Sequence, residues 1–235
     1  MIQSNQPTIF SDDIVVGVSS VDDGNMHFAF GDEDETRQNR IDFLRQLDID
    51  PTQATLISVS YEDTTDFARY RVVDEENLGE GMLASVSEYR ADALVVTRPD
   101  HALFLPLADC VGAIIYDPTT KVMMLSHLGR HSVEQDGAGK SVRYLVEEFG
   151  SEPGDLKIWL SPAVGSESYP LQAFENRSLQ DVVCGQLERA GIGLEQIEVS
   201  DVDTADDDNY FSHSEYLAGN QMTDGRFAIV AMMQD

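Results

Sequence analysis

Residues 91–130 read ADALVVTRPDHALFLPLADCVGAIIYDPTTKVMMLSHLGR and form the most apolar stretch of a strongly acidic chain. Four short runs within it are rich in aliphatic residues and are separated by turn residues, which predicts four strands. The runs are apolar throughout, a pattern typical of strands covered on both faces, so the stretch predicts a layered α/β domain. The predicted strands span residues 93–97, 102–107, 111–116 and 121–125.

The flanking sequence adds further elements. Apolar residues at helical spacing predict helices, and short β-rich runs predict strands. No repeat or low-complexity linker divides the chain, which indicates a single domain over residues 1–235. The predicted helices span 35–47, 139–149 and 179–190; the predicted strands span 14–19, 26–32, 55–60, 156–160, 196–200 and 226–232; and the predicted loops span 74–88, 161–168 and 201–209.

The charge excludes some classes of partner. The 235 residues include 43 Asp and Glu against 15 Lys and Arg, a formal net charge of -28. Nucleic acids and anionic membranes need a basic face, so we expect neither as a partner. An anionic substrate would need a local exception to this negative field. The N-terminal sequence has no features of a signal peptide and no apolar run is long enough to span a membrane, so we expect a cytoplasmic protein.

Turn chemistry at residues 117–120 brings Cys110 towards His127. The sequence DPTT favours a hairpin turn between two β runs. If these four residues form the loop, Tyr116 faces Lys121, and Cys110 faces His127 with their Cβ atoms about 5 Å apart. Such a pair suits a zinc site with further ligands from elsewhere. It also suits a nucleophilic thiolate with His127 as its base, or a buried cysteine beside a core histidine.

The same stretch resembles the laccase-domain family, also called the YfiH-type or multicopper polyphenol oxidase family. The resemblance implies a single layered sandwich of mixed β-sheets with helices outside. Members of this family have been assigned purine nucleoside phosphorylase and adenosine deaminase activities. The matching motifs are ADALVVT at Ala91–Thr97, LADC at Leu107–Cys110, HLG at His127–Gly129, and SPAVG at Ser161–Gly165 with Tyr169; weaker matches include GVS at Gly17–Ser19, NR at Asn39–Arg40, FS at Phe211–Ser212 and DGR at Asp224–Arg226.

The resemblance implies a zinc site, with copper in some members, formed by one cysteine and two histidines. The cysteine and one histidine match Cys110 and His127. The other histidine position falls on Ser60, and a serine hydroxyl is a poor zinc ligand. Val21 and His131 stand where the family has arginines, which are the natural side chains for holding phosphate.

Three functions follow as hypotheses. The first is a zinc enzyme acting on purine nucleosides, in which His131, His101, His213 or Asp109 replaces the missing ligand. The second is a metal-free thiol hydrolase or deamidase that uses Cys110 and His127 as nucleophile and base. The third is a non-catalytic homologue that binds a nucleoside or a protein partner. We expect a monomer or small homo-oligomer whose substrate contacts come from Asp109, His131, Tyr169 and His213.

Overall fold

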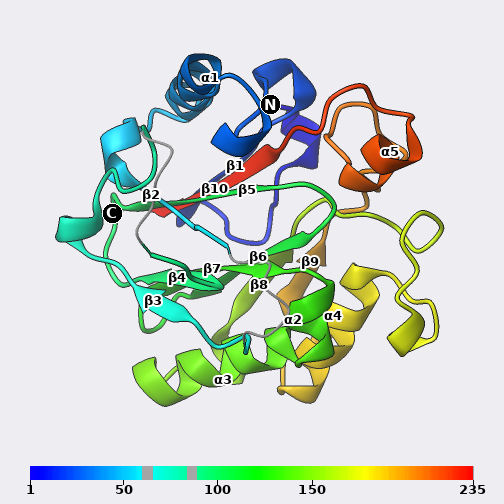
Figure 1. Cartoon of the computed structure of the whole chain (residues 1–235). Coiled ribbons are helices and arrows are strands. Elements are labelled where there is room, and N and C mark those ends of the chain that lie inside the picture. The colour runs from blue at the N-terminus through cyan, green and yellow to red at the C-terminus, as the bar shows by residue number, and fades with distance from the viewer. Residues whose placement is uncertain (60–65, 84–88, 235) are drawn as a thin grey trace.

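The computed structural model describes residues 1–59, 66–83 and 89–234. A four-stranded sheet packs against a six-stranded sheet, and helices lie outside both (Figure 1). This arrangement confirms the predicted layered sandwich of mixed sheets. Among the described residues, no helix is long and apolar enough to cross a membrane.

The four-stranded sheet has the order β1-β10-β5-β2. β10 runs antiparallel to both β1 and β5, whereas β2 runs parallel to β5. Alternate side chains of β10 face the other sheet, and those between them pack towards α1. The N-cap residue of α1 is Asp32, whose carboxylate accepts hydrogen bonds from two backbone N–H groups of the first turn. The bounds are β1 Ile14–Val18, β2 Ala54–Leu56, β5 Ala102–Leu107, β10 Phe227–Met233 and α1 Glu33–Arg45.

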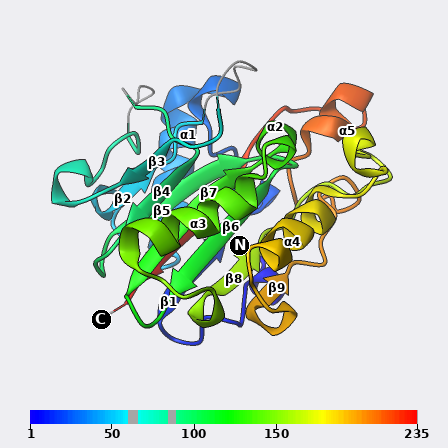
Figure 2. The ribbon, with the colours of Figure 1, turned by 90° about the horizontal axis from the view of Figure 1, so that it is seen from below.

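The six-stranded sheet has the order β3-β4-β7-β6-β8-β9. β6 and β7 are buried along their whole length, because the other sheet covers one face and helices α2, α3 and α4 cover the other (Figure 2). The bounds are β3 Tyr70–Val72, β4 Ala93–Val96, β6 Val111–Asp117, β7 Val122–Leu128, β8 Lys157–Leu160, β9 Ile197–Val199, α2 Arg130–Glu134, α3 Gly137–Phe149, α4 Leu179–Arg189 and α5 His213–Ala218. Short 3-10 turns lie at Gln3–Asn5, Val21–Asp23, Phe28–Phe30, Pro51–Gln53, Glu75–Asn77, Pro153–Asp155, Gln172–Phe174 and Leu194–Gln196.

The predicted strand at 26–32 is wrong. This segment forms a 3-10 turn at Phe28–Phe30, because the ring of His27 accepts a hydrogen bond from the backbone N–H of Ala29 and caps the turn. The predicted strand at 55–60 is shorter than expected, since β2 ends at Leu56 and Ser60 lies outside the described residues. The predicted loop at 74–88 contains the Glu75–Asn77 turn, and its residues 84–88 also lie outside the described part.

The predicted register of the β6–β7 hairpin is also wrong. Tyr116 pairs with Met123 and not with Lys121. Asp117 belongs to the strand, and its carboxylate accepts hydrogen bonds from the backbone N–H groups of residues 119 and 120 at 2.8 and 3.1 Å. The loop therefore comprises residues 118–121, and Lys121 closes it in the left-handed conformation with φ 56°. An aspartate that caps its own turn has moved the loop one residue along the chain.

Candidate functional site

A cavity of about 240 Å³ lies where β7 ends and α2 begins. It holds both residues that the sequence singled out, Cys110 and His127. The remaining side chains mix aromatic, basic, acidic and small polar groups, which is the lining expected of a small-molecule site. The cavity is lined by Val59, Phe67, Asp92, Cys110, His127, Gly129, Arg130, His131, Ser132 and Tyr169.

Cys110 reaches the cavity through a tight crossing between the two sheets. β5 ends at Leu107 in one sheet and β6 begins at Val111 in the other. Asp109 lies within this short link and adopts the left-handed conformation with φ 70°, which aspartate tolerates better than most residues. One of its carboxylate oxygens accepts from the Thr204 hydroxyl at 2.9 Å, and the other accepts from the backbone N–H of Ser214 at 2.6 Å. These bonds fix the turn that presents the Cys110 thiol.

Gly129 leaves room for Cys110 and His127 to approach the same point. His127 pairs with Gly112 in the hairpin, and Gly129 follows two residues later on the same face. A Cβ atom on Gly129 would lie 2.9 Å from Cys110 Sγ and 3.5 Å from His127 Cε1. The thiol and the imidazole therefore flank one small space. Because the φ of Gly129 is -100°, this glycine is required for space and not for its backbone conformation.

Both groups are neutral near pH 7. Burial lowers the pKa of His127 to about 4, against a smaller effect from Asp92 that raises it. Burial, followed by the charge of Asp109, raises the pKa of the Cys110 thiol to about 12, although Arg226 opposes the rise. A thiolate–imidazolium pair would need a low thiol pKa and a higher imidazole pKa. The structure therefore favours a neutral thiol beside a neutral imidazole.

Asp92 forms the acidic wall of the cavity and is tied to the backbone around it. Its side chain is buried and accepts two hydrogen bonds from the guanidinium of Arg69, at 2.6 and 3.1 Å. It also accepts from the backbone N–H groups of Ala68 and Arg69. The backbone carbonyl of Asp92 accepts from the N–H of His127 at 2.9 Å. This network holds β7 at the cavity and ties the segment before β3 to it.

The other predicted site residues fall into two groups. Tyr169 and His131 line the cavity, and the His131 ring lies 2.8 Å from the side-chain nitrogen of Gln135. Asp109, His213 and His101 are absent from the lining. Asp109 fixes the turn described above, His213 bonds to Asp224, and His101 is buried with its Nε2 2.7 Å from the Thr55 hydroxyl. The predicted substrate contacts of Asp109 and His213, like those of Tyr169 and His131, stay predictions.

Comparison with known proteins decides the family. The model of the family described as multi-copper polyphenol oxidoreductase laccase matches residues 12–234. The chain belongs to this laccase family. It is 26% identical over 161 residues to a purine nucleoside phosphorylase of Mycobacterium tuberculosis, which is 61% of this chain and 62% of that relative. It is 27% identical over 111 residues to a purine nucleoside phosphorylase of Streptomyces coelicolor, which is 47% of this chain and 46% of that relative.

Solved structures share the laccase-family fold. YlmD from Geobacillus stearothermophilus aligns with a TM-score of 0.84 at 19% identity, covering 97% of this chain and 94% of that one. The hypothetical protein YfiH from Bacillus licheniformis aligns with a TM-score of 0.81 at 20% identity, covering 94% and 93% of the two chains. These matches confirm the YfiH-like fold expected from the motifs.

The described residues do not fit the three-ligand zinc site that the laccase-family resemblance implies. Within them, no group of three or more His, Cys, Asp or Glu side chains is placed to hold a metal ion. Cys110 and His127 supply two donors, and Ser60, at the third position, lies outside the described residues. A catalytic zinc site takes three protein ligands and an open position for water. We therefore assign no chemical step to a metal.

Several cavity residues were not predicted as site residues from the sequence, among them Phe67, Asp92 and Arg130. Asp92 carried a usable signal, because it is the single acidic residue before the apolar run of β4 (Ala93–Val96) and belongs to the ADALVVT motif. Arg130 follows Gly129 at the start of α2. Phe67 lies in a segment with no regular secondary structure, and nothing in the local sequence pattern indicates its place.

Proposed function

We propose that this laccase-family protein binds purine nucleosides in the Cys110–His127 cavity and cleaves them by phosphorolysis. The cavity itself carries the proposal, because it combines aromatic walls with a few converging polar groups. Phe67 and Tyr169 offer faces for a purine ring, and Asp92 and His127 offer hydrogen-bonding groups. The names of the Mycobacterium and Streptomyces relatives support this choice of substrate.

In phosphorolysis, a phosphate oxygen forms a bond to C1′ of the ribose while the bond from C1′ to the purine nitrogen breaks. The purine leaves with the bonding electrons and takes up the proton that the hydrogen phosphate gives up. A neutral imidazole in a buried site can hold a hydrogen bond to the purine without charging the pocket. The same protonation states give little support to a thiol hydrolase or deamidase, because the Cys110 thiol stays protonated near pH 7.

The test has a binding arm and a turnover arm. Calorimetry with inosine and adenosine should show binding to the wild-type protein. Tyr169→Ala should weaken binding by about tenfold or more and Tyr169→Phe should not, because stacking needs the ring and not the hydroxyl. Chromatography should then show free hypoxanthine or adenine only when phosphate is added. Absence of nucleoside binding at millimolar concentration would sink the proposal. Binding without phosphate-dependent release would leave the non-catalytic homologue.

A further inference from the structure

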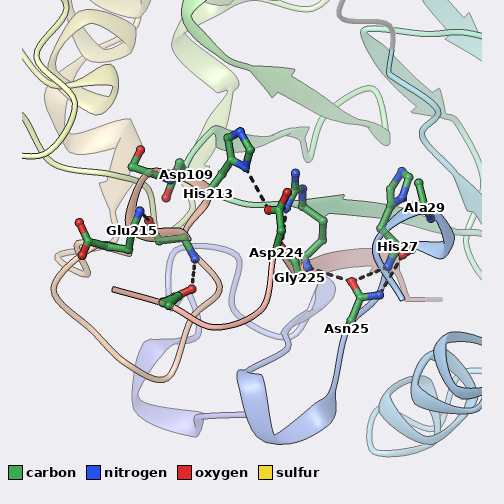
Figure 3. Close-up of polar contacts among 12 residues, drawn as sticks. Asn25, His27, Ala29, Asp109, His213, Glu215, Asp224 and Gly225 are labelled. Atoms are coloured by element: carbon green, nitrogen blue, oxygen red, sulfur yellow. Dashed lines mark hydrogen bonds and ion pairs between the residues drawn. The ribbon is translucent and has the colours of Figure 1, made fainter. Parts of the chain in front are cut away.

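A second cluster of polar side chains lies close to the Cys110 end of the cavity. The cluster has four members. Arg226 and Asp224 lie in the segment that leads into β10, His213 is the first residue of α5, and His27 caps the turn that replaces the predicted strand at 26–32. The link to the cavity is Asp109, which precedes Cys110 and accepts a hydrogen bond from the backbone of Ser214, next to His213 (Figure 3). The proposed function assigns no role to this cluster.

Arg226 is held in a fixed orientation, and two of its guanidinium nitrogens make no hydrogen bond to the described residues. Its Cζ atom lies 3.7 Å from the centroid of the Phe30 ring, so the planar group stacks on the aromatic face. Nη1 donates to Asp224 at 2.6 Å and to the carbonyl of Gly225 at 2.6 Å. Within the described residues, Nε and Nη2 make no hydrogen bond to the protein. The side chain keeps 10% of its surface exposed, which leaves these donors within reach of a small ligand.

The two histidines lie on either side of Asp224 in Figure 3, and both rings point the same way. Nδ1 of His27 accepts from the N–H of Ala29 at 3.1 Å, so the proton of the neutral ring lies on Nε2. Nδ1 of His213 faces the Asp224 carboxylate at 3.0 Å and donates to it. The Nε2 atoms have no protein partner in the described ranges. His27 therefore presents a neutral donor, and its ring contacts the Phe30 ring on which Arg226 stacks, with 5.1 Å between the two ring centroids.

At His27 the nearby charges are positive, although the protein carries a formal charge of -28: Arg40, Arg226 and Arg90 all lower the pKa of its ring. Both carboxylates are engaged: Asp224 by Arg226 and His213, and Asp109 by Thr204 and Ser214. Arg40, which is 1% exposed, donates to the backbone carbonyl of Met26, next to His27, and to two further backbone carbonyls, and it stacks on Phe28 at 4.3 Å. Within the described residues, Arg40 has no carboxylate partner. Its uncompensated charge is the local exception that an anion would need.

The pKa of His27 reports the same field. Burial, followed by the charges of Arg40, Arg226 and Arg90 in that order, lowers it to about 4. Asp224 behaves in the opposite way: burial works to raise its pKa, but hydrogen bonds and charge from Arg226 and His213 outweigh burial and lower it. The cluster therefore holds negative charge well and disfavours an additional proton on His27.

We propose that Arg226 and His27 form a binding subsite for a phosphate-type oxyanion beside the Cys110 cavity. Arg226 supplies charge-assisted donors from Nε and Nη2, and His27 supplies a neutral N–H. The subsite would bind phosphate in place of the family arginines, whose positions are occupied here by Val21 and His131. Its role as the position of the attacking phosphate rests on the proposed function, but its capacity to bind an oxyanion does not.

The test measures oxyanion binding without nucleoside. Inorganic phosphate should raise the thermal unfolding midpoint of the full-length protein above that in chloride of equal ionic strength. Arg226→Gln should weaken phosphate binding about tenfold in calorimetry. The charge-matched control is Arg45→Gln, a surface residue that pairs with Asp42, and it should leave binding unchanged. Equal losses in the two variants, or no phosphate effect on the wild-type protein, would overturn the proposal.

A second pair of variants separates binding from folding. His27→Asn keeps an acceptor for the N–H of Ala29 and removes the Nε2 donor, so it should bind phosphate about fivefold more weakly with little change in stability. His27→Gln should keep a side-chain N–H donor for phosphate near the position of Nε2. It should lose the acceptor that caps the turn by bonding the N–H of Ala29. If Arg226→Gln does not fold, the asparagine variant decides: unchanged phosphate binding would overturn the proposal.

Adenosine monophosphate, run beside inorganic phosphate, distinguishes the source of the oxyanion. A loss of affinity in Arg226→Gln for inorganic phosphate supports a free phosphate subsite, and a larger loss for the nucleotide than for inorganic phosphate supports a nucleotide phosphoryl group. Loss for neither overturns the proposal. Phosphate binding in a protein that binds no nucleoside would refute the proposed function and leave the subsite standing.

Discussion

Gly129→Ala is the sharpest test of how the site is built. The substitution adds one methyl group at the point that Cys110 and His127 both flank. Its Cβ would lie 2.9 Å from Cys110 Sγ and 3.5 Å from His127 Cε1. The backbone at Gly129 has φ -100°, which alanine adopts without strain, so any cost must come from side-chain crowding.

The magnitude follows from the overlap. Non-bonded heavy atoms are optimally separated by about 3.5–4.0 Å, so the new methyl group overlaps the sulfur by roughly 0.6–1 Å. His127 is 6% exposed and is held by the strand, so it cannot easily move away. Overpacking a fixed site costs about 1–3 kcal/mol. Replacing glycine by alanine also lowers the conformational entropy of the unfolded chain, which stabilises the folded state by about 0.4–1 kcal/mol. We expect a net loss of about 1–2 kcal/mol.

Urea denaturation of four proteins measures this cost: the wild type, Gly129→Ala, Cys110→Ala and the double variant. Removing the sulfur makes space for the methyl group, so the double variant should recover at least about 1 kcal/mol relative to additive effects. Gly154→Ala is the matched control, because no atom lies within 4 Å of its added Cβ and its φ is not positive. If Gly129→Ala is as stable as the wild type, or the double variant is additive, the close approach at Gly129 is wrong.

Three further predictions concern protonation, metal and a buried charge. Burial lowers the pKa of His101 from 6.5 to about 4, so as the pH falls the unfolded chain is protonated at this ring before the folded protein is. The stability present above pH 6.5 is therefore lost as the pH falls towards 4. His101→Gln should reduce the dependence of the unfolding free energy on pH between these values, as measured by urea denaturation. Elemental analysis of the purified protein should find well under one zinc per chain. Near-stoichiometric zinc in the wild type that is lost in Cys110→Ala would contradict this and show that a third ligand comes from outside the described residues. Arg40→Leu leaves three backbone carbonyl acceptors without their donor and should cost at least about 3 kcal/mol in denaturant unfolding, and a cost under about 1 kcal/mol would contradict the assigned contacts.

Long elements with clear periodicity could be predicted from the sequence, whereas short edge elements could not. β3 spans three residues, and its Val72 is exposed, so it carries no hydrophobic pattern. α5 spans six residues, too few for a helical stripe. It did carry a start signal, because Ser212 is followed three residues later by Glu215 and its hydroxyl accepts from the N–H of that residue. The signal was local, and tertiary contact through Asp109 then fixed where the helix lies.

The candidate site shows which part of a register argument survives an error. The predicted hairpin placed Cys110 opposite His127, whereas the structure places His127 opposite Gly112 and puts Cys110 beside Gly129. The pairing has moved by two residues. Side chains in a strand alternate between faces with a period of two, so a shift of two keeps every side chain on its face, and a shift of one would have sent the thiol and the imidazole to opposite faces. The two groups therefore still meet, but as diagonal neighbours. This offset opens the space above Gly129, and directly opposed side chains would have filled it.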